Sequence, residues 1–427
     1  MLIILGINGY PALAQQQNYV TSDIDNFWTA YDKIIATTDS AKQYRYINEE
    51  YIRKGSPGLA GMMQAREYTA KSYIDAINSY PKYWASIRNN TLKAKSLAAG
   101  IGSGIEKLKG LYPALRPANM YFVIGALRSP GTISDGKILI GSELALADEH
   151  TVTSEFPASR DHLKDYFKNN PINNTVFLNV HEYVHTQQQV PAYILLYQSI
   201  YEGVAEFVAE KATGIASTTP AIAYGKAHTQ TVREKFIKEM FSPYTSNWLY
   251  NSRQNVFDTR DLGYYVGYAV CESYYNEAGD KKQAIREMIE LDYADETAFE
   301  KFVTTSGYFP VTLKTARAMY EKNRPVVVGI KEFKNGSKTV DAGLSKISIE
   351  FSAPMDVRYR SFELGPLGID NLLRMAGFTG FSEDGKTAGF EIKLQPGKQY
   401  QVIIGEGFRS TDAIPVRPYL IDFTTAK

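Results

Sequence analysis

The sequence is poor in cysteine and has no large excess of either charge. Cys271 is the only cysteine among 427 residues, so no internal disulfide can form. No activating groups surround Cys271, which predicts a buried thiol and not a nucleophile. Lys and Arg number 47 against 46 Asp and Glu, for a net charge of +1. This balance gives no field that would attract nucleic acid or an anionic membrane, and we expect neither as a partner.

Basic residues are also missing from the N-terminus, where none occurs before Lys33. Met1 to Leu13 is mostly apolar, and Ala12-Leu13-Ala14 is a small-x-small pattern typical of signal-peptide cleavage. A start codon assigned inside the true signal peptide would explain the missing basic residues, and a buried N-terminal strand is the alternative. We therefore expect residues 1–14 to be a truncated signal peptide.

This leader bears on localisation and on membrane attachment. The apolar run is too short to span a bilayer, so no transmembrane segment is expected. No cysteine follows the run, which argues against a lipid anchor. The sequence thus predicts a protein secreted by a bacterium, or held in its periplasm or at its cell surface.

A chain of this length is too long for one ordinary core and suits two or three domains. Helical periodicity dominates residues 15–110, where Phe27, Trp28 and Tyr31 fall on one face. Two strands follow, Met120–Leu127 and Lys137–Ile140, separated by turn signals. Helical patterns return from about residue 174 to residue 322.

The pattern changes at Arg324-Pro325, after which short β-prone runs alternate with turn signals such as Asn335-Gly336 and Pro396-Gly397. Five or more short strands in about 100 residues are typical of a β-sandwich. We therefore predict an α+β fold in three parts after the leader. These are a helical region at 15–110, a mainly helical domain with a small sheet at 111–323, and an all-β sandwich at 324–427.

Residues 181–185 read His-Glu-Tyr-Val-His. On a helix, positions i and i+4 lie on one face, so His181 and His185 can bind one zinc ion. Glu182 can accept a proton from water at that ion, which lowers the pKa of bound water to about 7. The alternative is a helix face with two ordinary polar histidines, and we expect His150, His162 and His228 to be ordinary polar residues.

A catalytic zinc needs a third protein ligand, and the segment Glu202-Gly203-Val204-Ala205-Glu206 supplies one. Glu202 and Glu206 stand one turn apart on a predicted helix. Glu202 can ligate the metal, and Glu206 can accept the far ring N–H of a ligating histidine. The alternative is a solvated carboxylate stripe that continues to Glu210.

Together these two motifs resemble the gluzincin clan of zinc metallopeptidases. The chain is most similar to predicted zinc-dependent proteases that also carry a later Gly-Tyr-x-x-Gly-type helix, here Gly263 to Tyr268. The resemblance covers roughly residues 20–323. It implies a zincin-like catalytic domain at 111–323 and an edge strand that holds extended peptide by β-augmentation, for which Lys137, Ile138, Leu139 and Ile140 are the candidates.

On the same helix, Tyr264 is the candidate for a hydroxyl that stabilises the oxyanion, and packing of all three tyrosines there is the alternative. The tail, with Ala353-Pro354-Met355-Asp356, resembles the SbsA-type bacterial Ig-like domain. Such domains are spacers or binding modules, which makes the cell surface or glycans candidate contacts of the tail.

The sequence thus predicts a secreted zinc metallopeptidase with a peptide or protein substrate, acting as a monomer. The alternative from another class is an exported binding or adhesion protein that keeps an idle zincin scaffold. The intact Glu182 argues against that alternative, because an idle site has no chemical use for a base there.

Overall fold

The computed structural model describes residues 19–251 and 255–427, so the predicted signal peptide lies outside the described residues. The described residues form two compact units that interleave along the chain. One unit holds the described residues up to Val190 together with Val204–Thr219 and Tyr275–Asp292. The other holds the described residues of Pro191–Gly203, Pro220–Tyr274 and Tyr293–Lys427.

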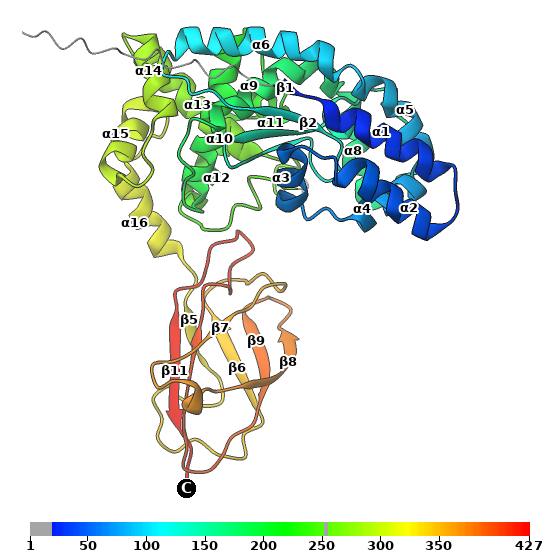
Figure 1. Cartoon of the computed structure of the whole chain (residues 1–427). Coiled ribbons are helices and arrows are strands. Elements are labelled where there is room, and N and C mark those ends of the chain that lie inside the picture. Colours follow the sequence, from blue (N-terminus) through cyan, green and yellow to red (C-terminus); the bar gives the residue numbers. More distant parts are fainter. Residues whose placement is uncertain (1–18, 252–254) are drawn as a thin grey trace, which may run out of the picture. The chain divides into compact units, whose positions relative to one another are not determined.

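Helices occupy most of the chain between residues 22 and 111, as the periodicity predicts. Buried aromatic rings hold this region together: the ring centroids of Phe27 and Trp84 lie 5.1 Å apart, and those of Phe27 and Tyr51 lie 5.3 Å apart. The helices are α1 (Ser22–Ile35), α2 (Ser40–Tyr46), a π-helical turn (Ile47–Ile52), α3 (Pro57–Ala65), α4 (Ala70–Ser79), α5 (Pro81–Thr91) and α6 (Ala94–Leu111) (Figure 1).

A four-stranded sheet follows, with the order β1-β2-β4-β3. Its strands are β1 (Tyr19–Val20), β2 (Met120–Val123), β3 (Gly131–Ser134) and β4 (Lys137–Gly141). β2 pairs in parallel with β1 and β4, whereas β3 and β4 form an antiparallel hairpin. Asp135 and Gly136 turn the hairpin with φ of 48° and 69°, as a tight two-residue hairpin turn requires.

Two sequence-based predictions about this sheet need correction. β4 is paired on both sides, so the prediction that Lys137–Ile140 forms the edge is wrong, and β3 is the edge strand. The strand predicted from Met120 to Leu127 ends at Val123. It ends early because the buried Glu143 carboxylate accepts the N–H groups of Gly125 at 2.7 Å and Leu127 at 3.2 Å.

Helices α7 to α16 continue the chain. They are α7 (Ser142–Ala145), α8 (Asp161–Lys168), α9 (Thr175–His185), α10 (Leu195–Thr213), α11 (Pro220–Ala227), α12 (Thr229–Glu239), α13 (Leu262–Glu277), α14 (Lys281–Ile289), α15 (Glu296–Ser306) and α16 (Leu313–Asn323). Cys271 lies on α13 and is buried, as predicted. Among the residues that the structure describes, no helix combines the length and apolarity needed to cross a membrane.

Strands β5 to β11, yellow to red in Figure 1, form two sheets with the orders β5-β6-β9-β8 and β11-β10-β7. One hydrophobic core takes buried side chains from both sheets, among them Ile349 and Phe390 from one and Val402 and Ile421 from the other. The strands are β5 (Val327–Ile330), β6 (Lys346–Phe351), β7 (Phe362–Glu363), β8 (Met375–Phe381), β9 (Thr387–Ile392), β10 (Gln399–Ile404) and β11 (Tyr419–Thr424).

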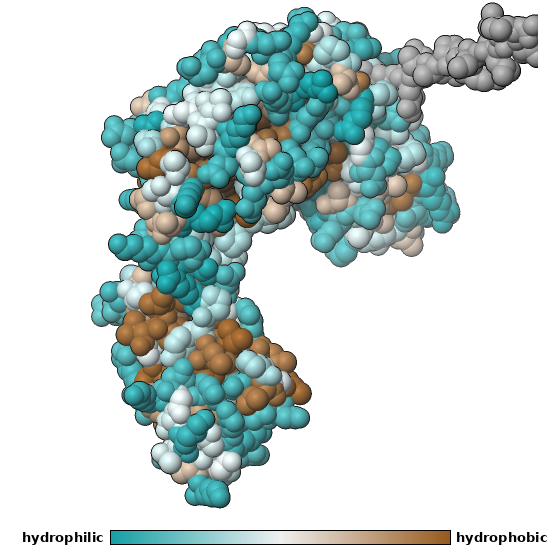
Figure 2. Space-filling model, turned by 90° about the vertical axis from the view of Figure 1, so that its left-hand side faces the viewer, coloured by the Kyte–Doolittle hydropathy of each residue, from teal (hydrophilic) through white to brown (hydrophobic). Residues whose placement is uncertain are grey.

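The surface of this β-rich region is partly apolar, and Figure 2 shows hydrophobic side chains gathered on it. Its exposed large hydrophobic residues are Val328, Val357, Tyr359, Leu364, Leu367, Ile369 and Phe378. The described residues thus combine helices with three small sheets, which confirms the α+β class at that level. The zincin-like and Ig-like assignments and the boundaries at 110/111 and 323/324 stay predictions.

Candidate metal centre

Helix α9 carries the two histidines because its apolar residues fix its position in the unit. Phe177, Val180 and Val184 are fully or almost fully buried. Gly104 on α6 lets α9 come close: a β-carbon there would lie 2.9 Å from Cγ2 of Val180. His181 and His185 lie on a neighbouring face of α9 and are 6% and 8% exposed.

Hydrogen bonds set the tautomer of both rings. Nδ1 of His181 lies 2.9 Å from Oε2 of Glu206, and Nδ1 of His185 lies 2.7 Å from Oε1 of Gln188. Both partners are oxygen acceptors, so each Nδ1 carries the hydrogen and each neutral ring presents a lone pair at Nε2. The two Nε2 atoms face each other at 3.1 Å. Two facing lone pairs repel, and a cation between them removes the repulsion.

Glu202, on α10, completes the cluster. One ligand atom from each of His181, His185 and Glu202 lies within 4.8 Å of the others, and Glu202 is 5% exposed. Two imidazoles and a carboxylate are a donor set that zinc accepts in proteins. The structure therefore confirms that these three residues form a buried cluster able to bind a metal ion.

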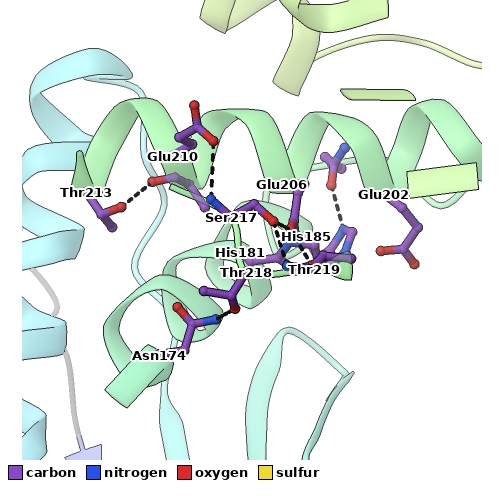
Figure 3. Close-up of polar contacts among 12 residues, drawn as sticks. Asn174, His181, His185, Glu202, Glu206, Glu210, Thr213, Ser217, Thr218 and Thr219 are labelled. Carbon is purple, nitrogen blue, oxygen red and sulfur yellow. Dashed lines mark hydrogen bonds and ion pairs between the residues drawn. The ribbon is translucent and has the colours of Figure 1, made fainter. Parts of the chain in front are cut away.

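Glu206 lies one helical turn further along α10 and holds His181 in place (Figure 3). Its second oxygen, Oε1, accepts hydrogen bonds from the hydroxyl groups of Ser217 and Thr219. Burial raises the pKa of Glu206, but the hydrogen bond from His181 and those from the two hydroxyl groups outweigh burial, so the pKa lies below its ordinary value. Glu206 is thus a charged acceptor fixed on both oxygens.

Two tyrosines hold the Glu202 carboxylate. The hydroxyl of Tyr250 donates a hydrogen bond to Oε1 of Glu202, and Tyr264 on α13 is also hydrogen-bonded to Glu202. Desolvation of the hydroxyl and the Glu202 charge raise the pKa of both tyrosines, although Tyr250 as a whole residue is 58% exposed. The other two tyrosines of the predicted motif have other partners: Tyr265 bonds Thr229 at 2.7 Å, and Tyr268 lies under Lys226.

No sequence motif marks Tyr250. It lies in an irregular segment between α12 and α13, with an unusual φ of 56°. No periodic pattern marks such a position, and the positive φ of a non-glycine residue becomes visible only in the structure.

Glu182 is half-buried on α9, beside the edge strand of the sheet. Among the described residues, its carboxylate has neither an ion pair nor a hydrogen bond, and it is free to act as a base. A β-carbon placed on Gly131 of β3 would lie 3.6 Å from Oε1 of Glu182. The start of the edge strand therefore lies next to this carboxylate.

The free side of β3 offers backbone groups for pairing. Gly141 N donates to Pro130 O, so alternate residues of β3, Thr132 and Ser134, bond toward β4. The N–H groups of Gly131 and Ile133 then point toward the open edge. The remaining histidines lie outside the cluster; His228 bonds the Tyr224 carbonyl, and His150 is exposed.

Comparisons with known proteins add little to this geometry. No family model and no curated protein matches the chain. One of the solved structures that match is "Crystal structure of the S-layer protein rSbsC(31-844)", at 14% identity and a TM-score of 0.19. The match covers 95% of this chain, which spans 45% of the S-layer chain. A similarity this weak supports no inference about fold or activity.

Proposed function

We propose that this chain is an exported zinc metallopeptidase of the gluzincin type that hydrolyses peptide bonds in peptides or proteins. The observation that carries the proposal is the buried cluster of His181, His185 and Glu202, with Nε2 of both rings directed at one point. Two imidazoles and one carboxylate would hold a zinc ion and would leave room for water as a further ligand, as catalytic sites require.

Zinc, when bound, supplies a Lewis acid that makes water nucleophilic at neutral pH and polarises a carbonyl. Glu182 accepts the proton of the attacking water and passes it to the leaving amine. Its lack of a partner among the described residues supports this role, because a paired carboxylate would be a weaker base. Glu206 and Gln188 keep both rings in the tautomer that binds metal.

Substrate backbone pairs with β3 in this proposal, and not with the inner strand β4. The N–H groups of Gly131 and Ile133 face the open edge, and Gly131 lies next to Glu182. An extended peptide added to this edge would run past the general base. Tyr264, or Tyr250 beside it, supplies a hydroxyl that stabilises the developing oxyanion.

The proposal is tested with Glu182→Gln, which keeps the size of the side chain but cannot accept a proton. We expect this variant to retain zinc and the melting temperature of the wild type. Its kcat/KM on a peptide that the wild type cleaves should fall by about 10²–10⁴-fold or more. Wild-type rates in Glu182→Gln would refute the mechanism, and a zinc-loaded wild type that cleaves no peptide of a generic library would favour the binding or adhesion protein.

The roles of Tyr264 and Tyr250 are distinguished by kinetics with the same peptide. Tyr264→Phe and Tyr250→Phe each remove one hydroxyl from Glu202, and Tyr265→Phe is the matched control because its hydroxyl bonds Thr229. A loss of roughly 10²-fold in kcat with zinc retained identifies the oxyanion donor. If both variants have the kcat of the wild type, neither tyrosine stabilises the oxyanion, and the other steps of the mechanism are unaffected.

A further inference from the structure

Arg66 is a half-buried cation directly after α3, with no acidic partner among the described residues. Its Nη2 donates a long hydrogen bond of 3.4 Å to the carbonyl oxygen of Gly131, and its buried Nε has no hydrogen-bond partner. A guanidinium offers five donors in a planar fork, so most of the hydrogen-bonding capacity of Arg66 is unused. An unpaired, half-buried arginine is costly unless a ligand supplies the acceptor.

Nearby arginines differ from Arg66 in this respect. Nη1 of Arg128 donates to the backbone carbonyls of Arg66 at 2.6 Å and Glu67 at 3.1 Å. Nη1 of Arg160 donates to the carbonyl of Leu127 at 2.8 Å. Both therefore brace loops with short hydrogen bonds. The single long contact of Arg66 braces β3 poorly.

Gly131 places Arg66 beside the proposed catalytic base. The carbonyl of Gly131 accepts from Arg66, and the α-carbon of the same residue faces Oε1 of Glu182. With ordinary bond lengths, these contacts limit the separation of Nη2 and Oε1 to at most about 11 Å. An extended peptide covers this separation in about three residues.

We propose that Arg66 binds a carboxylate of the substrate, within about three residues of the bond that is cleaved. This inference rests on the proposed peptidase function. Arginine suits the task because its fork matches the two oxygens of a carboxylate, and it remains charged at any working pH. The carboxylate is either the free C-terminus of the peptide, which would make the protein a carboxypeptidase-like exopeptidase, or an Asp or Glu side chain.

Binding to the zinc-loaded full-length Glu182→Gln chain tests the inference without turnover. The probes are three acetylated pentapeptides of alanine and phenylalanine, measured by isothermal titration calorimetry. One ends in a free carboxylate, one in a carboxamide, and one in a carboxamide with aspartate at the last position. We expect one of the two acidic peptides to bind about 10- to 100-fold more tightly than the neutral amide, as a charge-assisted hydrogen bond provides.

The preference should disappear when Arg66→Gln is added to Glu182→Gln, and Arg66→Lys should restore part of it, because lysine keeps the charge without the fork. Arg53→Gln removes the same charge from an exposed position and should leave the preference intact. The two acidic peptides identify the source: preference for the free acid indicates the C-terminus, and preference for the aspartyl amide indicates a side chain.

Equal affinity for all three peptides, absence of binding by any of them, or a preference that survives Arg66→Gln would overturn the inference. The proposed function is judged separately from cleavage by the wild type. If the wild type cleaves nothing while the preference depends on Arg66, the carboxylate site stands and the peptidase fails. If it cleaves the free-acid, amidated and aspartyl peptides alike and Arg66→Gln changes none of the three rates, the peptidase stands and the carboxylate site fails.

Discussion

Each candidate ligand of the proposed metal centre is held by at least one other residue that fixes its orientation. Glu206 fixes His181, Gln188 fixes His185, and the two tyrosines fix Glu202. A side chain that cannot rotate loses less entropy when it ligates a metal, so these contacts favour binding before any ion arrives. Removing a ligand and removing its support should therefore have effects of different size.

Glu202→Ala leaves two protein ligands, and we expect zinc binding to become too weak to survive dialysis. Glu206→Ala keeps all three ligands but frees the His181 ring, and we expect a loss of about 10- to 100-fold in zinc affinity. Competition with a fluorescent chelator measures both constants. Glu210→Ala, in the same helix and outside the cluster, is the control. If Glu206→Ala strips the metal and Glu202→Ala does not, the two roles are reversed.

Glu143 provides a pH-dependent prediction away from the metal. Burial raises the pKa of its carboxyl to about 7. Hydrogen bonds from the N–H groups of Gly125 and Leu127 lower this pKa, but burial has the larger effect. The folded state thus binds the proton more tightly than the unfolded chain, whose carboxyl keeps its ordinary pKa near 4.5. This contribution to stability is fully present below about pH 4.5 and is lost as the pH rises through about 7.

The test compares unfolding of the wild type and Glu143→Gln in urea between pH 4.5 and 8. We expect the wild type to lose about 3 kcal/mol of stability relative to the variant over this interval, since each unit of pKa shift corresponds to about 1.4 kcal/mol. The variant itself loses one acceptor for the backbone, which shifts its curve by a constant amount. If the difference in unfolding free energy between the wild type and Glu143→Gln does not change with pH, the assigned pKa of Glu143 is wrong.

At the residue scale, local spacing was enough to predict part of the site. His181 and His185 share a helix face at i and i+4, and that geometry needs no tertiary information. Glu202 was predicted from the need for a third ligand and from the carboxylate motif that follows the histidines, but the spacing of the residues left open whether it reaches them. Tyr250 and Arg66 could not be predicted, since no motif marks either residue and each meets a partner that is distant in sequence.

At the scale of elements, close helix packing underlies the site. A β-carbon on Gly203 would lie 2.1 Å from the carbonyl carbon of Gly267, and one on Gly267 would lie 1.8 Å from the carbonyl oxygen of Ser199. Helices α10 and α13 therefore meet backbone to backbone. This approach is what lets Tyr264 on α13 reach Glu202, which precedes Gly203 in the chain.

Gly203→Ala should separate these helices. We expect the free energy of unfolding to fall by about 1–3 kcal/mol, and zinc affinity to fall as well, because the added methyl group meets backbone atoms that cannot turn away. Gly110→Ala on α6 is the matched control, since nothing lies within 4 Å of its β-carbon and alanine favours the helix by about 0.5–1 kcal/mol. Equal stabilities for the two variants would show that α10 and α13 are not in such close contact.

The order of the strands lay beyond sequence reasoning. Two turn signals precede β4, Ser129-Pro130-Gly131 and Ser134-Asp135-Gly136. The four-residue strand β3 begins in the first signal and ends in the second, so no β pattern is visible in its sequence. The resemblance to the gluzincins suggested Lys137–Ile140 as the edge, yet β4 is paired on both sides. Strand pairing depends on contacts distant in sequence, which local patterns do not encode.

At the scale of the whole molecule, the change of pattern at Arg324-Pro325 predicted a tail of five or more short strands, and the tail has seven, β5 to β11. The weakest strand signals belong to β7, which has two residues, and to β8, which contains Gly377 and Gly380. The buried core of this region draws only on residues between Val327 and Phe423. A region with its own core has the means to fold by itself.

We therefore expect a polypeptide of residues 325–427 to show a β-type circular dichroism spectrum, dispersed amide resonances and cooperative melting. Val402→Ala, at a fully buried position, should lower its stability by about 2–4 kcal/mol, through lost burial and the cavity left behind. Val328→Ala is the matched control: this valine is 66% exposed, and its loss should change stability by no more than about 0.5 kcal/mol. Unfolding is measured at low protein concentration, because self-association through the exposed apolar side chains would raise the apparent stability. An unfolded polypeptide, or equal effects of the two valine substitutions, would mean that the tail needs the rest of the chain to fold.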